Sequence, residues 1–160
     1  MTESSLKDLG WSDYFADQIR PEEIALTPPV RVTDVHRNRI SVQSGNGHQD
    51  LAFPDGIRSS DVAVGDWVLS DPITGQLIRV LGRQTVLQRA SAGDASTEQL
   101  IAANIDTLLI VSSCNADFNP ARLERYLALA AGSGTRAVMV LTKADLRAEA
   151  EAYGGQAEAL

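Results

Sequence analysis

With 160 residues, of which 44% are apolar, the chain is long enough for one ordinary domain or two small ones and is apolar enough to fold. The single cysteine, Cys114, excludes an intramolecular disulfide, and with only two histidines, His36 and His48, the sequence offers no zinc cluster. No apolar run is long enough to cross a bilayer and the N-terminus lacks a signal-peptide pattern, so we predict a cytoplasmic protein that does not bind membranes.

The net charge of −7 is distributed unevenly along the chain. Residues 1–27 and residues 92–160 each carry a net charge of −4, whereas residues 28–91 contain seven arginines and six aspartates, for a net charge of +1. An evenly acidic protein would repel nucleic acid, so only the middle segment is a candidate RNA-binding region. Because an arginine-rich surface is often merely solvated, charge alone leaves both interpretations open.

Residues 1–27 are predicted to form an N-terminal arm. Their apolar residues, from Leu6 to Ile19, are spaced loosely as in a helix, and the pair Pro28-Pro29 must end any helix that forms. We expect a short helix or arm that lies against the next part of the chain.

Residues 28–91 are predicted to form a small β-barrel. Apolar and polar residues alternate in short segments separated by turn signals such as Asn46-Gly47. The predicted strands are 30–35, 39–43, 48–53, 65–69 and 76–81. Five such strands indicate a closed barrel of the OB type, with an SH3-like barrel as the alternative.

Residues 92–99 lie in a small, polar stretch that predicts a linker, and residues 100–160 have an α/β pattern. Two buried strands, 107–112 and 137–141, flank a helix that starts at Pro120 behind the N-cap Asn119 and runs to about Ala131. This βαβ unit is expected to be parallel and right-handed.

A final helix is predicted after Leu146, ending by Gly154-Gly155. Two strands and two helices cannot cover both faces of a parallel sheet. The α/β part is therefore expected to be the first portion of a larger domain.

Thr142-Lys143-Ala144-Asp145 directly follows the second buried strand, at the edge of the sheet where ligands bind in open parallel sheets. A carboxylate at Asp145 can accept hydrogen bonds from guanine N1–H and from the exocyclic amino group, and adenine lacks this pair of donors. The stem of Lys143 can pack on the flat base, and the hydroxyl of Thr142 can bind neighbouring backbone. The alternative, that Asp145 only caps the last helix, stays open.

The sequence contains no phosphate-binding loop of the type G-x-x-x-x-G-K-[ST]. This pattern needs a Gly-Lys pair, but the only two lysines, Lys7 and Lys143, follow Leu6 and Thr142. Either the tetrapeptide is accidental or the nucleotide domain is rearranged and incomplete.

Arginines of the barrel region are candidate contacts to RNA phosphates. They are Arg37, Arg39, Arg79, Arg83 and Arg89. Stacking of bases is less expected, because Phe53 and Trp67 are the only aromatic residues of this region and Trp67 is predicted to lie in the core. Structured RNA, recognised through its backbone and shape, fits better.

Several motifs in this order resemble the ribosome small-subunit-dependent GTPase A family (RsgA, also called YjeQ), whose GTPase domain is circularly permuted so that the guanine motif precedes the phosphate loop. The resemblance extends from about Leu9 to Leu146. The similar segments are 64–68 (VGDWV), 102–106 (AANID), 115–126 (NADFNPARLERY) and 141–146 (LTKADL).

The resemblance implies that Thr142, Lys143, Ala144 and Asp145 bind GTP or GDP, and that the complete protein hydrolyses GTP during maturation of the small (30S) ribosomal subunit. It also implies that the barrel contacts 16S rRNA. Mg²⁺ and Zn²⁺ are implied only for later parts of the family's chain, so we assign no metal ligand and no catalytic residue here. We expect a monomer with negligible GTP hydrolysis of its own. The alternative is an RNA- or ribosome-binding OB module without nucleotide hydrolysis.

Overall fold

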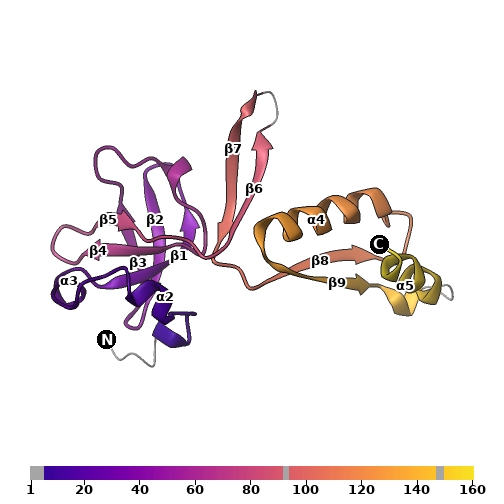
Figure 1. Ribbon diagram of the computed structural model, residues 1–160, viewed down its shortest axis with the longest axis horizontal. Coiled ribbons are helices and arrows are strands. Elements are labelled where there is room, and N and C mark those ends of the chain that lie inside the picture. The colour runs from indigo at the N-terminus through magenta and orange to yellow at the C-terminus, as the bar shows by residue number, and fades with distance from the viewer. Residues whose placement is uncertain (1–5, 92–93, 147–149) are drawn as a thin grey trace. The chain divides into compact units, whose positions relative to one another are not determined.

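The computed structural model describes residues 6–91, 94–146 and 150–160. The chain forms two compact units, Met1–Asn104 and Ile105–Leu160 (Figure 1). None of the helices in the described segments is long and apolar enough to cross a membrane.

A closed five-stranded barrel forms most of the first unit. Its strands are β1 (Pro29–Val35), β2 (Arg39–Ser44), β3 (Gly47–Ala52), β4 (Trp67–Asp71) and β5 (Gln76–Val80). They follow the order β1-β2-β3-β5-β4, and β4 pairs with β1 to close the barrel. All neighbours are antiparallel except β3 and β5, which meet at the single parallel pair Ala52 and Gln76. The predicted OB-type barrel is confirmed.

Alternation along the strands places one set of apolar side chains inside the barrel. Val30 and Val32 of β1 face Ile40 and Val42 of β2, and all four are at most 1% exposed. The remaining buried members of this core are Leu51, Val62, Val68 and Leu77. Each such side chain contributes about 1.5–3 kcal/mol by leaving water, which makes the barrel the stable platform of this unit.

Strand β4 is buried on both faces because the N-terminal arm covers its outer side. The arm contains the short helices α2 (Asp13–Ala16) and α3 (Pro21–Leu26). Trp67 and Leu69 point out of the barrel and pack against this arm, where the ring of Trp11 meets that of Trp67 edge-on at 4.7 Å. The predicted contact between the arm and the barrel, and the core position of Trp67, agree with the structure.

A two-stranded hairpin stands where the sequence predicted a linker. Strands β6 (Val86–Ser91) and β7 (Asp94–Ala103) are antiparallel, and the division between the two units lies after Asn104 instead of within residues 92–99. Small polar residues carry little strand signal, whereas cross-strand hydrogen bonds form with almost any side chain. The hairpin is attached to the barrel at its base, where Ala103 N–H donates to Val64 O at 2.8 Å.

The second unit is the predicted βαβ crossover. Strands β8 (Thr107–Ser113) and β9 (Arg136–Thr142) are parallel and in register over their whole length, and helix α4 (Pro120–Ser133) joins them. Asn119 caps the helix by accepting a hydrogen bond from Arg122 N–H at 3.0 Å, and Gly134, with a φ of 71°, ends it.

The last helix differs from its prediction. Helix α5 (Ala150–Glu158) continues through Gly154-Gly155, although each glycine costs about 1 kcal/mol relative to alanine within a helix. Tertiary packing offsets this cost, because Tyr153 stacks edge-on against Phe118 at 5.2 Å and Ala157 is buried.

One face of the β8–β9 sheet is open to solvent. Leu109 and Val111, neighbours on this face, are 59% and 62% exposed. This agrees with the expectation that two strands and two helices leave a parallel sheet incompletely covered.

Candidate functional site

Thr142 starts the predicted guanine motif at the edge where the two parallel strands end. Its hydroxyl donates a hydrogen bond to Ser112 O at 3.2 Å, and its own carbonyl accepts one from Cys114 N–H at 2.9 Å. The end of β9 is therefore attached at two points to the end of β8. The hydroxyl of Thr142 thus binds neighbouring backbone, as the sequence predicted. The hydrogen bond from Cys114 N–H depends on strand register, and nothing in the sequence indicates it.

The backbone turns sharply at Lys143, which has a φ of 59° in the left-handed region. Few residues other than glycine adopt this conformation, and in functional sites such strain is maintained by surrounding contacts. Leu146 N–H donates to Lys143 O at 3.2 Å and closes the short 3₁₀ helix η2 (Ala144–Leu146). This turn leaves the side chains of Lys143 and Asp145 exposed at the edge of the sheet.

The exposed position of Asp145 bears on whether this residue binds guanine or only caps the last helix. Asp145 lies within η2, and its side chain is exposed. An exposed carboxylate on a fixed turn remains able to accept two hydrogen bonds from a flat base that presents two adjacent N–H donors.

The loop after β8 lies at the same edge and is ordered by its own side chains. Asn115 Oδ1 accepts hydrogen bonds from Ser113 Oγ and from Asp117 N–H, both at 2.9 Å. Arg122 of α4 then donates to Asp117 O at 2.7 Å. These hydrogen bonds order the loop at the edge where the Thr142–Asp145 turn lies.

The described residues contain no group of three or more His, Cys, Asp or Glu side chains placed to hold a metal ion. We assign no chemical step to Mg²⁺ or Zn²⁺ here.

The five arginines predicted to contact RNA have different environments. Arg83 binds the fully buried Asp66 through two hydrogen bonds of 2.7 Å, and Arg39 pairs with Asp50 at 3.0 Å. Arg79 donates to both carboxylate oxygens of Glu23, at 3.2 and 3.1 Å. Arg83 and Arg79 are therefore engaged in holding the first unit together.

Arg37 and Arg89 differ from these three because both line a surface groove of the first unit. Arg37 follows β1 and is exposed, and no hydrogen bond or ion pair joins it to any residue in the described segments. Arg89 of β6 donates to Gln99 Oε1 of β7 at 3.3 and 3.1 Å, which fixes the guanidinium on the hairpin. The structure thus brings together two of the five predicted arginines.

The pair formed by Arg79 and Glu23 predicts a pH dependence of stability. The hydrogen bond from Arg79 holds the pKa of Glu23 below its ordinary value of 4.5. Because the carboxyl pKa is lower in the folded state than in the unfolded state, the charged form of Glu23 stabilises the fold above its ordinary pKa. This stabilisation is lost as the pH falls through the folded-state pKa. We expect Glu23→Gln to lower the thermal midpoint at pH 7 and to have no effect near about pH 2, where neither glutamate nor glutamine at this position carries a charge. Equal midpoint differences at both pH values would contradict this.

Comparisons with known proteins point to the family that the sequence resembles. The family model described as RsgA GTPase matches residues 80–160. The chain is 53% identical over 156 residues to the small ribosomal subunit biogenesis GTPase RsgA of Mesorhizobium japonicum, covering 98% of this chain and 44% of that protein. It is 43% identical to RsgA 2 of Vibrio vulnificus, covering 92% of this chain and 41% of that protein.

A solved structure has the same fold. The crystal structure of YjeQ from Thermotoga maritima matches 82% of this chain and 46% of its own with a TM-score of 0.57, at 20% identity. The chain spans less than half the length of the curated relatives it matches. Since the family model covers more than half of the chain, the protein belongs to the RsgA GTPase family.

Proposed function

We propose that this chain is the guanine-recognising and RNA-contacting part of a GTPase that acts in biogenesis of the small ribosomal subunit. Family membership supports the general activity. The observation that carries the nucleotide assignment is the left-handed turn at Lys143, held by hydrogen bonds at Thr142 and Leu146 on the ligand-binding edge of a parallel sheet.

In this proposal the turn recognises the base by matching hydrogen-bond donors. Asp145 accepts from N1–H and the amino group of guanine, and the aliphatic stem of Lys143 covers one face of the ring. Adenine presents no such donor pair, so its binding would desolvate the Asp145 carboxylate without replacing the lost hydrogen bonds. The pair Thr142 and Cys114 sets the position from which the turn starts.

Hydrolysis of GTP would belong to the complete protein. Phosphoryl transfer depends on a phosphate cradle and Mg²⁺, and the sequence has no Gly-Lys pair for such a cradle. A circularly permuted domain, in which base recognition precedes phosphate binding, accounts for a guanine motif without one.

The barrel unit would contribute the contact with the 30S subunit and its 16S rRNA. Arg37 and Arg89 lie on one groove and supply positive charge where neighbouring arginines are already paired. The alternative, an RNA-binding module that does not use nucleotide, is favoured by the absence of a phosphate loop from the sequence.

Binding of fluorescent GDP and fluorescent ADP separates these two functions. We expect the native chain to prefer GDP by about tenfold or more, because one unmatched polar group in a recognition site is costly. Asp145→Ala should bring the ratio of the two affinities close to one. The matched control is Asp117→Ala, which removes an exposed carboxylate from the neighbouring loop and leaves its backbone contacts in place.

Equal binding of both nucleotides by the native chain, or an unchanged ratio in Asp145→Ala, would contradict the guanine assignment. In that case retained, salt-dependent binding to purified 30S subunits would favour the RNA-binding module.

A further inference from the structure

A groove between the barrel and the β6–β7 hairpin is lined in part by apolar side chains. Its volume of about 840 Å³ lies within the range of about 300–1,000 Å³ found for ligand sites. Val64 and Ile101 are each 41% exposed and both line it. The parallel bridge between Val64 and Ala102 brings together the two backbone segments that carry these residues. Large apolar side chains that remain exposed together in a concave surface indicate a binding site.

Polar side chains, including charges of both signs, also line this groove. Arg37 and Arg89 supply positive charge, and Asp34 supplies a carboxylate. Further donors and acceptors come from Ser59 and Ser60 at the start of the 3₁₀ helix η1 (Ser59–Asp61). A surface that bound only phosphates would gain from neither the carboxylate nor the exposed apolar side chains.

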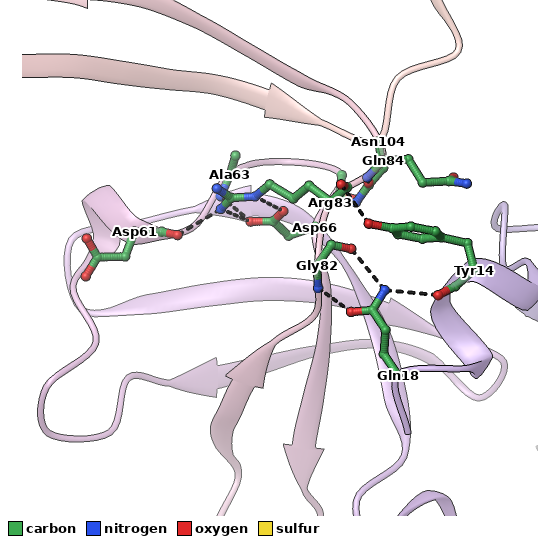
Figure 2. A network of polar contacts seen from close by, with 10 residues as sticks. Tyr14, Gln18, Asp61, Ala63, Asp66, Gly82, Arg83, Gln84 and Asn104 are labelled. Atoms are coloured by element: carbon green, nitrogen blue, oxygen red, sulfur yellow. Dashed lines mark hydrogen bonds and ion pairs between the residues drawn. The ribbon is translucent and has the colours of Figure 1, made fainter. Parts of the chain in front are cut away.

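The two walls of the groove are fixed relative to each other because the hairpin is attached to the barrel at both ends. At the outgoing end, Asn104 Nδ2 donates to Gly65 O at 3.1 Å. At the incoming end, Arg83 binds Asp66, and Gln84 N–H donates to Asn104 Oδ1 at 2.8 Å, which joins the two ends of the hairpin to each other (Figure 2). A preformed groove loses less conformational freedom on binding than one that must assemble.

We propose that this groove binds a single unpaired base that projects from structured RNA, with Arg37 and Arg89 on the flanking phosphates. The proposal rests on the RNA-binding role given above and specifies which RNA feature is recognised. An extruded base has apolar faces and a polar edge, which match the apolar side chains of Val64 and Ile101 and the carboxylate of Asp34. A fully paired duplex presents neither its base faces nor their Watson–Crick edges to the groove.

The test compares two end-labelled RNA duplexes that differ only by one bulged base, with dissociation constants measured by fluorescence anisotropy on the full chain. We expect the native chain to bind the bulged RNA about tenfold more tightly, because one face of the base leaves water against aliphatic side chains. Ile101→Ser should bring the two affinities together. Ile73→Ser is the matched control, because Ile73 is 93% exposed in the β4–β5 turn and does not line the groove.

Arg37→Ala separates this proposal from the RNA-binding role on which it rests. Loss of a phosphate contact should weaken both RNAs by the same factor and reduce the salt dependence of binding by about one ion. If Arg37→Ala weakens both RNAs while the native chain binds them equally, the base site is excluded and RNA binding stands. If neither RNA binds, the RNA-binding role fails as well.

Because Ile101 is partly exposed, an unchanged thermal midpoint of Ile101→Ser will show that the variant is folded. A preference for the bulged RNA that survives in that folded variant would also overturn the base site.

Discussion

Replacement of Gly65 by alanine is expected to destabilise the first unit by about 2–5 kcal/mol. Gly65 has a φ of 91°, and a Cβ at this position would lie 2.1 Å from Ala103 O. That oxygen belongs to the backbone at the end of the hairpin, so it cannot rotate away as a side chain would. The added methyl group must separate the hairpin from the barrel, which breaks the hydrogen bond from Ala103 N–H to Val64 O.

Urea unfolding followed by tryptophan fluorescence measures this change. Both tryptophans of the chain, Trp11 and Trp67, lie in the first unit, so the signal reports on that unit alone. Gly75→Ala is the matched control, because Gly75 has a φ of 67° and an added methyl group would meet nothing within 4 Å. It should cost only the backbone strain of about 1–2 kcal/mol. Equal losses in the two variants would show that the close approach to Ala103 contributes nothing.

Replacement of Asp66 by alanine is expected to cost about 3–5 kcal/mol, because it leaves the guanidinium of Arg83 without its partner. Asp66 is fully buried and accepts hydrogen bonds from Arg83 Nε and Nη2 and from Ala63 N–H (Figure 2). The pairing with Asp66 raises the pKa of Arg83. Without Asp66 the arginine still keeps its charge, because a guanidinium is always protonated in proteins. Asp50→Ala removes the partner of an exposed arginine and should cost less than about 1 kcal/mol.

The double substitution Asp66→Ala with Arg83→Met tests the physical cause of this loss. Removing both charges eliminates the unpaired guanidinium, so the double variant should be more stable than Asp66→Ala alone. The comparison uses the same urea titration. A double variant that is less stable than the single one would contradict the unpaired charge as the main cost and would indicate that packing around Arg83 dominates.

Much of the fold could be predicted from short-range patterns. Alternation between residues 30 and 81 predicted the five barrel strands, and Asn119 predicted the start of α4. These features depend on residues that are close in sequence, where periodicity and capping directly reflect burial and hydrogen bonding. The hairpin at 86–103 was missed because its small polar residues form strands only through pairing with each other.

The candidate sites divide in the same way. The sequence by itself determined which residue types make up the Thr142–Asp145 turn and the arginine-rich character of the barrel, because both are properties of residue type and local order. Only the tertiary structure decided that Lys143 adopts a left-handed turn, that Arg79 and Arg83 are engaged by Glu23 and Asp66, and that Arg37 and Arg89 share a groove. These outcomes depend on partners far away in the chain, and neither composition nor spacing specifies which distant carboxylate lies beside a given arginine.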